Sequence, residues 1–125
     1  MKYLGAIAVV LLVAAVVAFA RDALETTEAV TSGAAAARGH ALIQHYGCGN
    51  CHSIPDVPGA DALVGPPLDR IGSRVYIAGV LTNTPENMAR WIQDPRAVDP
   101  LTAMPKLGVS DEDATNIVAY LYTLR

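Results

Sequence analysis

The five residues Cys48-Gly49-Asn50-Cys51-His52 constrain this chain more than any other stretch. Two thiols separated by two residues, with a histidine directly after the second, form the attachment signature of a c-type haem. Each thiol can add to one vinyl group of the porphyrin, and the adjacent imidazole is then directed at the iron. The sequence therefore predicts one covalently bound haem c on Cys48 and Cys51, with His52 as the proximal ligand.

Two other chemistries use paired cysteines, and the sequence disfavours both. A structural zinc site needs four protein ligands, usually supplied as two pairs, and this chain has no third cysteine. A thioredoxin-type dithiol needs a βαβ setting, and no Val/Ile-rich strand runs flank the motif. The haem interpretation is therefore the one that we carry forward.

The apolar residues of the chain are concentrated at its N-terminal end. The hydrophobic fraction is 52% of 125 residues, but an uncharged run from Leu4 to Ala20 raises it. About 90 residues remain for a folded body, which is small for a self-sufficient core. A buried porphyrin supplies apolar bulk that the chain lacks, so we expect folding and cofactor binding to be coupled.

Beyond Ala20 the chain is acidic. All 12 acidic residues lie there, together with every basic residue except Lys2, and the net charge of this part is about −4. The sequence has no basic patch of the kind that binds nucleic acid, and Lys106 is its only lysine beyond residue 20. We expect redox partner proteins to dock through short-range apolar contacts and hydrogen bonds rather than through strong positive steering.

The first 21 residues are typical of an export segment. The run from Leu4 to Ala20 ends in Ala18-Phe19-Ala20, a small-x-small cleavage site. Seventeen helical residues span roughly 26 Å, slightly less than the hydrocarbon core of a bilayer. We predict a retained signal-anchor helix over residues 1–21, which places the rest on the periplasmic side of the bacterial inner membrane. A cleaved signal peptide and a soluble periplasmic protein are the alternative.

The stretch that follows is predicted to change from linker to helix. Residues 22–33 mix Glu, Thr, Ser and Ala without an apolar stripe, and we interpret them as a polar, partly helical linker. Residues 34–46 then place Leu42, Ile43 and Tyr46 on one helical face before the stop at Gly47. The folded domain is therefore expected over residues 34–125.

Two further helices are predicted, and no stretch of useful length is typical of a strand. One begins at the cap Thr84 with Pro85 in its first turn, ends before Pro95, and carries an apolar face. The other begins at the cap Ser110. We expect the two terminal helices to pack across each other, with Gly39 facing an aromatic residue such as Tyr120. The apolar faces consist of Met88, Trp91 and Ile92 in the first and Ala114, Ile117, Val118, Leu121 and Leu124 in the second.

With these elements in place, residues 34–125 resemble a class I, mono-haem cytochrome c. The resemblance implies an all-α fold, in which crossed N- and C-terminal helices and Gly/Pro-rich loops surround one covalently bound haem, with the N-terminal hydrophobic helix in addition. The matching segments, in chain order, are Gly47–His52, Gly65–Leu68, Ile71–Arg74, Asn87–Ile92, Met104–Leu107 and Ala119–Leu121.

The resemblance implies that a methionine completes the iron coordination opposite His52, and Met104 fits because it lies in a loop before the last helix. Elimination supports this choice. Met88 lies on the apolar face of a helix, Met1 lies at the membrane end, and His40 and His45 are too close to the attachment site. The alternative is a loop methionine that fills a gap in the core.

The resemblance also implies supporting roles around the haem. The carbonyl of Pro66 would accept the second ring N–H of His52 and fix its tautomer. Arg74 and Trp91 look like the partners of a haem propionate, against the alternatives of a solvated arginine and a core tryptophan. Tyr76 and Asn83 are further candidates for propionate contacts.

Two protein ligands fill both axial positions, so the resemblance implies an electron carrier rather than an enzyme. The expected function is that of a membrane-tethered periplasmic cytochrome that passes single electrons from a quinol-oxidising complex to a terminal oxidase. A haem subunit fixed within a larger oxidase or dehydrogenase complex is the alternative. A peroxidase or ligand-binding haem would require Met104 to leave the iron.

Overall fold

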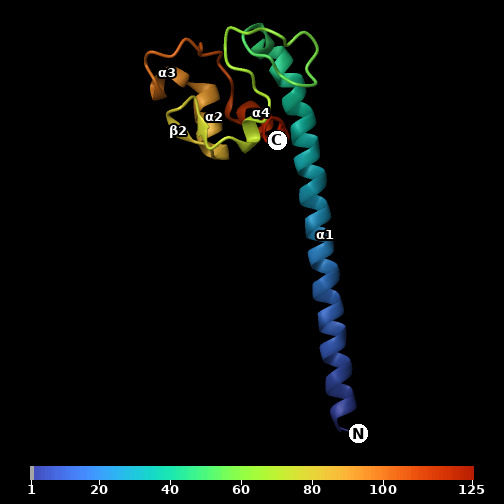
Figure 1. Cartoon of the computed structure of the whole chain (residues 1–125). Coiled ribbons are helices and arrows are strands. Elements are labelled where there is room, and N and C mark those ends of the chain that lie inside the picture. Colours follow the sequence, from blue (N-terminus) through green and yellow to red (C-terminus); the bar gives the residue numbers. More distant parts are fainter. Residues whose placement is uncertain (1) are drawn as a thin grey trace. The chain divides into compact units, whose positions relative to one another are not determined.

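The computed structural model describes the backbone of residues 2–125 and the side chains of residues 7, 9–22 and 32–125 (Figure 1). The chain divides into two units, Met1–Ser32 and Gly33–Arg125. Helix α1 (Lys2–His45) contributes backbone to both units. The backbone of residues 22–33, expected as a linker, is therefore helical.

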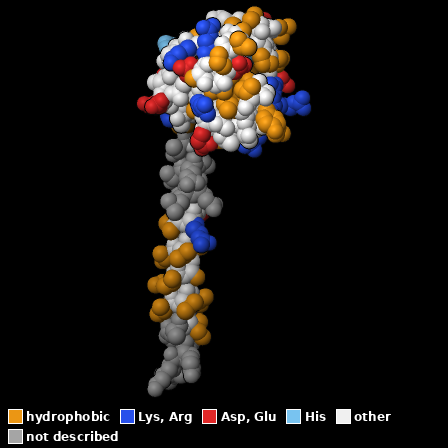
Figure 2. All heavy atoms as spheres, turned by 90° about the vertical axis from the view of Figure 1, so that its left-hand side faces the viewer, with side chains coloured by type: hydrophobic (Ala, Val, Ile, Leu, Met, Phe, Trp, Pro, Cys, Tyr) orange, Lys and Arg blue, Asp and Glu red, His pale blue; other side chains and the backbone are white. Residues whose placement is uncertain are grey.

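The first unit exposes its described apolar side chains, which Figure 2 shows along this segment. Among the residues whose side chains are described, no helix combines the length and mean hydropathy of a membrane span. The predicted anchor over residues 1–21 falls in part on residues 1–6 and 8, whose side chains lie outside the described residues. The exposed apolar residues are Ile7, Val9, Val10, Leu11, Leu12, Val13, Val16, Val17 and Phe19.

The last helix, α4 (Asp111–Leu121), begins at the predicted cap. Ser110 accepts a hydrogen bond from the backbone N–H of Asp113, and three acidic residues occupy the first turn, where the helix dipole favours negative charge. The predicted apolar stripe is confirmed, because all five of its residues are buried. Leu124 lies just beyond the helix, in the turn that ends the chain.

Helix α2 (Pro85–Gln93) also follows the local signals in the sequence. Thr84 caps it by accepting from the N–H of Asn87, and Pro85 occupies the first turn. Met88, Trp91 and Ile92 are buried on one face, as predicted. Helix α2 packs against α4, and this pair forms the centre of the second unit.

The predicted contact between the terminal helices is confirmed at Gly39 on α1. A Cβ at this position would stand 3.0 Å from Cβ of Tyr120 and only 2.0 Å from the backbone oxygen of Asn116. The helices therefore approach so closely that a glycine is required. The backbone of Asn116, rather than the aromatic ring of Tyr120, is the nearer neighbour.

Polar contacts reinforce this helix packing. Tyr46 donates its phenol proton to Oδ2 of Asp113 at 2.7 Å, and Tyr120 donates to the carbonyl oxygen of Pro55, also at 2.7 Å. Nε2 of His40 lies 2.8 Å from the carbonyl oxygen of Asp56. Both terminal helices thus hold the loop that follows the two cysteines.

The second unit contains a small hairpin that the sequence analysis did not predict. Strand β1 (Tyr76–Ile77) pairs antiparallel with β2 (Leu81–Thr82). The turn between them has positive φ at Ala78 (51°) and Gly79 (75°), as in turns that match the twist of a hairpin. Two residues per strand are too few to show an alternating pattern, which explains the missed prediction.

A short helix, α3 (Pro95–Val98), completes the regular structure, and 3-10 turns occur at η1 (Cys48–Asn50) and η2 (Ile71–Ser73). Asp94 ends α2 and caps α3 by accepting from the N–H of Ala97. The core is built from apolar side chains, and one polar residue, Asn116, is buried as well. Its residues are Ile43, Ile54, Val57, Ala60, Ile71, Ile77, Met88, Trp91, Ile92, Val109, Ala114, Ile117, Val118, Tyr120, Leu121 and Leu124.

We expect Gly39→Ala to destabilise the folded domain by about 1–3 kcal/mol, because its methyl group would overlap the Asn116 backbone and force the helices apart. Urea unfolding of the haem-loaded protein, followed by circular dichroism, measures this change. Gly33→Ala is the matched control, since a Cβ there meets nothing within 4 Å and alanine favours a helix. Equal stability of the two variants would contradict the packing role of Gly39.

The tyrosines predict how stability changes at alkaline pH. The hydrogen bond to Asp113 is the main cause that raises the pKa of Tyr46, and burial is the main cause that raises the pKa of Tyr120 and Tyr122. The folded state therefore holds these protons to a higher pH than the unfolded chain. Stability is full below about pH 10 and falls as the pH rises further.

We expect Tyr46→Phe to make this alkaline loss of stability shallower, because one of the protons that the folded state retains is removed. Urea midpoints measured at several pH values on either side of pH 10, roughly the ordinary tyrosine pKa, give the slope. Tyr76→Phe is the control, since Tyr76 is exposed on the hairpin. Identical slopes for the wild type and the Tyr46 variant would refute the assignment.

Candidate functional site

The loop that carries both cysteines begins where α1 ends. Gly47 has a φ of 69°, a left-handed conformation that glycine adopts without strain. In the 3-10 turn η1, the carbonyl oxygen of Cys48 accepts from the N–H groups of Cys51 (3.2 Å) and His52 (3.0 Å). One tight turn thus holds the two thiols and the histidine together.

Neither cysteine is in a disulfide, and both are partly buried. Burial is the main cause that raises the pKa of Cys48, and the nearby Cys51 adds to the effect. Two reduced thiols on one turn are the donor set that a c-type haem needs for its two thioether bonds.

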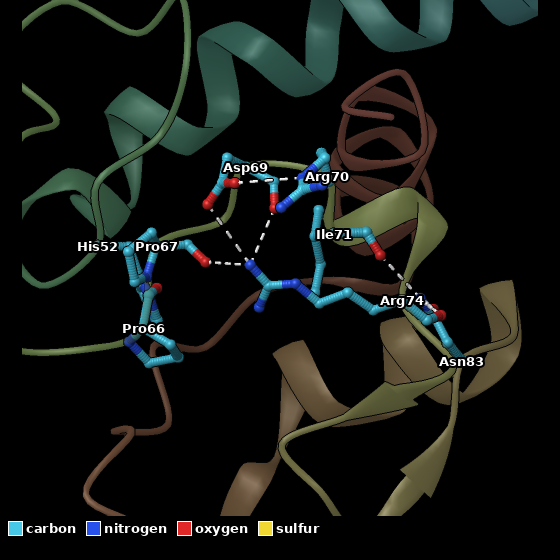
Figure 3. Close-up of polar contacts among 8 residues, drawn as sticks. All are labelled: His52, Pro66, Pro67, Asp69, Arg70, Ile71, Arg74 and Asn83. Carbon is cyan, nitrogen blue, oxygen red and sulfur yellow. Dashed lines mark hydrogen bonds and ion pairs between the residues drawn. The ribbon is translucent and has the colours of Figure 1, made fainter.

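The imidazole of His52 lies against a glycine. A Cβ on Gly65 would stand 2.5 Å from Cε1 and 2.7 Å from Nδ1 of His52, so a larger residue would displace the ring. Nδ1 lies 2.7 Å from the carbonyl oxygen of Pro66 (Figure 3). A carbonyl oxygen only accepts, so Nδ1 carries the proton and Nε2 keeps a lone pair for a metal. These residues fit a haem iron.

The segment after Gly65 runs beside the cysteine motif. The N–H of Gly65 donates to the carbonyl oxygen of Cys51 at 2.7 Å, and the N–H of Leu68 donates to that of Ser53 at 2.8 Å. The contact of His52 with Pro66 lies between these two bonds. The sequence signal Gly65-Pro66-Pro67-Leu68 therefore marks the backbone that faces the histidine.

Arg74 contacts the same backbone (Figure 3). Its Nη2 donates to the carbonyl oxygens of Pro67 at 2.6 Å and Asp69 at 2.9 Å, and lies 3.6 Å from the Asp69 carboxylate. Asp69, Arg70, Ser73 and Arg74 line an open cleft of about 220 Å³. Arg74 was expected to contact a haem propionate, and its bonds to these carbonyl oxygens were not predicted from the sequence.

Asn83 is a second residue whose contacts the sequence analysis missed. Its Nδ2 donates to the carbonyl oxygens of Ile71 and Arg74, both at 2.8 Å, and its Oδ1 accepts from the phenol of Tyr122 at 2.8 Å. The available signal was an asparagine directly before a helix cap, where such side chains bind backbone groups. Tyr76, the other propionate candidate, is exposed.

The two remaining predicted site residues lie on different elements. Met104 lies in the loop between α3 and α4, partly buried against the core, and its N–H donates to Oγ1 of Thr102 at 3.2 Å. Trp91 is buried on α2. In the described part of the chain, its indole N–H makes no hydrogen bond, and no enclosed side-chain polar atom lacks a partner. The indole nitrogen is therefore not fully buried. The roles of Met104 and Trp91 toward the haem stay predictions.

The Met104 loop is tied to the junction of α2 and α3. Nζ of Lys106 lies 2.6 Å from Oδ2 of Asp94, and this hydrogen bond is the main cause that lowers the pKa of Asp94. Asp94 also caps α3. The only lysine beyond residue 20 thus forms an ion pair within the folded domain.

Comparison with known proteins shows the family to which this chain belongs. The family model for cytochrome c matches residues 36–125. Cytochrome c oxidase subunit 2 of Alkalihalophilus pseudofirmus is 33% identical over 89 residues, which cover 70% of this chain and 25% of the relative. The same subunit of Bacillus subtilis is 32% identical over 96 residues, which cover 72% of this chain and 26% of the relative.

A third relative, cytochrome c oxidase subunit 2 of Bacillus sp. strain PS3, is 30% identical over 82 residues, which cover 62% of this chain and 23% of the relative. The chain thus spans about a quarter of the length of these relatives. The family match covers nearly all of the second unit, Gly33–Arg125. The chain therefore belongs to the cytochrome c family, whose members carry a covalently bound haem c.

Proposed function

We propose that this protein is a single-electron carrier whose haem iron is held by His52 and Met104. The observation that carries the proposal is the placement of His52. Its Nδ1 is bonded to the Pro66 carbonyl, Gly65 leaves room for the ring, and the same turn carries two cysteines that form no disulfide. When bound, the haem supplies a one-electron Fe(II)/Fe(III) couple. Cys48 and Cys51 fix the cofactor through thioether bonds.

The two axial residues define the chemistry that the protein permits. His52 offers Nε2, because its Nδ1–H is held by Pro66. Met104 offers a thioether sulfur, which favours the reduced iron and raises the reduction potential. If both side chains bound the iron, no position would remain for a substrate. This arrangement favours electron transfer over catalysis.

Arg74 and Trp91 are the proposed partners of the haem propionates. In the described part of the chain, Arg74 uses Nη2 for two carbonyls, whereas Nη1 and Nε make no hydrogen bond. These two donors are free to face a carboxylate. The indole N–H of Trp91 is not fully buried and has no partner within the described residues, which supports its assignment to a haem propionate.

We further propose that residues 1–21 anchor the protein in the inner membrane and hold the haem domain, residues 34–125, on the periplasmic side through the linker 22–33. The uncharged run from Leu4 to Ala20 and the exposure of its described apolar side chains support this placement. The haem domain would then pass electrons from a quinol-oxidising complex to a terminal oxidase.

A second candidate function is that of a haem subunit fixed within an oxidase complex. The observation that favours it is the similarity to cytochrome c oxidase subunit 2 in three organisms. In that case the N-terminal helix would pack against other subunits, and the electron acceptor would belong to the same complex. A soluble periplasmic carrier after signal cleavage is a third form of the same electron-transfer function.

We expect Met104→Ala to retain covalent haem but to lose the weak red-region absorption of a thioether-ligated ferric haem. Its reduction potential should fall, and the reduced protein should bind carbon monoxide rapidly, because one axial position opens. Met88→Leu is the control: Met88 is buried on α2, and this change should leave the absorption intact. Rapid carbon monoxide binding by the wild type would instead support a ligand-binding haem.

The anchor predicts that the membrane-bound protein retains its N-terminal segment. Intact-mass measurement of the haem protein from membranes should give the full chain plus one covalent haem. A soluble periplasmic form that begins at Arg21 would identify residues 1–20 as a cleaved signal. The same membrane extract, prepared in mild detergent and sized, separates the two candidate functions, since a carrier migrates as a small monomer and a subunit with its complex.

A further inference from the structure

Arg74 holds the backbone on which the His52 hydrogen bond depends. Its Nη2 donates to the carbonyl oxygens of Pro67 and Asp69 at 2.6 and 2.9 Å (Figure 3). Pro67 directly follows Pro66, whose carbonyl oxygen lies 2.7 Å from Nδ1 of His52. The guanidinium group therefore restrains the chain immediately after the acceptor that orients the histidine.

This backbone has few other supports. Pro66 and Pro67 have no N–H group, so neither can be fixed through a backbone donor. The N–H groups of Gly65 and Leu68 hold the two ends of the segment, but the peptide planes between them can still rotate about the ψ angles of the prolines. The bonds from Arg74 to the carbonyl oxygens of Pro67 and Asp69 limit that rotation.

The backbone of Arg74 is itself held by a hydrogen bond from another part of the chain. Its carbonyl oxygen accepts from Nδ2 of Asn83 at 2.8 Å, and Oδ1 of Asn83 accepts from Tyr122 at the end of α4. The ion pair with Asp69 spans 3.6 Å between groups that are 36% and 52% exposed, so it contributes little. The charge-assisted bonds to the carbonyl oxygens are the stronger contacts of Arg74.

We propose that Arg74 is a positioning residue for His52 and that it tunes the reduction potential through the Pro66 carbonyl. The inference rests on the proposed function, in which His52 ligates the haem iron. An imidazole whose Nδ1–H is firmly bonded is a stronger electron donor, and it stabilises Fe(III) and lowers the potential. Arg74 keeps that bond short by holding Pro67 and Asp69.

A positioning role and a purely electrostatic role predict opposite changes in the reduction potential when Arg74 is replaced. Removing a positive charge near the iron stabilises Fe(III) and lowers the potential. Releasing the Pro66 carbonyl weakens the His52 bond and raises the potential. Arg74→Lys separates the two effects, because lysine keeps the charge but lacks the rigid, planar geometry of a guanidinium group.

The test compares the reduction potential and the hydrogen exchange of the His52 Nδ1 proton, followed by NMR in the reduced haem protein. We expect Arg74→Lys to speed this exchange and to shift the Fe(II)/Fe(III) equilibrium toward Fe(II) by up to about tenfold, which is about 59 mV for one electron. Arg70→Lys is the matched control. The Arg70 side chain is 78% exposed, and within the described residues its only polar contact is with the Asp69 carboxylate, at 3.6 Å, so neither quantity should change.

Asn83→Ala is a second variant that releases the Arg74 carbonyl without changing the charge. It should move the exchange rate and the potential in the same direction as Arg74→Lys, by a smaller amount. An unchanged exchange rate and potential in both variants would overturn the positioning role. So would a lower potential in Arg74→Gln with unchanged exchange, since that is the signature of charge alone.

The same measurements distinguish a failure of this inference from a failure of the proposed function. A wild-type protein with covalent haem, His/Met absorption and a slowly exchanging Nδ1 proton retains the proposed function whatever the Arg74 variants do. A wild-type protein without histidine-ligated haem would remove both.

Discussion

The close packing of α1 on α4 at Gly39 is the constraint on which the rest of the second unit depends. Only a glycine lets the two backbones approach to this distance, because a Cβ would meet the carbonyl oxygen of Asn116 at 2.0 Å. Once the helices are in contact, His40 and Tyr120 reach the carbonyl groups of Asp56 and Pro55. The loop beyond the cysteines is therefore held from two sides by the helix pair.

The haem motif and the segment Gly65–Leu68 are joined to each other by hydrogen bonds. His52, Cys51 and Ser53 each bind a group in the segment Gly65–Leu68, and Arg74 binds the carbonyl oxygens that follow. Backbone polar groups in an irregular loop need such partners, since an unpaired buried group costs about as much as a lost hydrogen bond. Satisfying these groups also fixes the direction of the His52 ring, so one set of contacts serves both stability and the proposed ligand geometry.

Local signals predicted the parts of the fold whose cause is local. The caps Thr84 and Ser110, the proline at the start of α2 and the buried faces of α2 and α4 were all anticipated, because each depends on residues within one or two helical turns. The hairpin was not anticipated, because two-residue strands are too short to show an alternating pattern. Alanine also gives no indication that residue 78 takes a positive φ. The helix α3 was not predicted either, because its four residues are too few to show a helical pattern.

The sequence by itself determined the chemistry of the site. One turn of the chain holds Cys48, Cys51 and His52, so no tertiary contact is needed to bring these groups together. Only the tertiary structure decided what surrounds them. Arg74 binds the carbonyl oxygens next to Pro66, and Asn83 joins that loop to Tyr122 across 39 positions of sequence. Such partners lie far apart in the sequence and meet only in the folded chain, so no short motif predicts them.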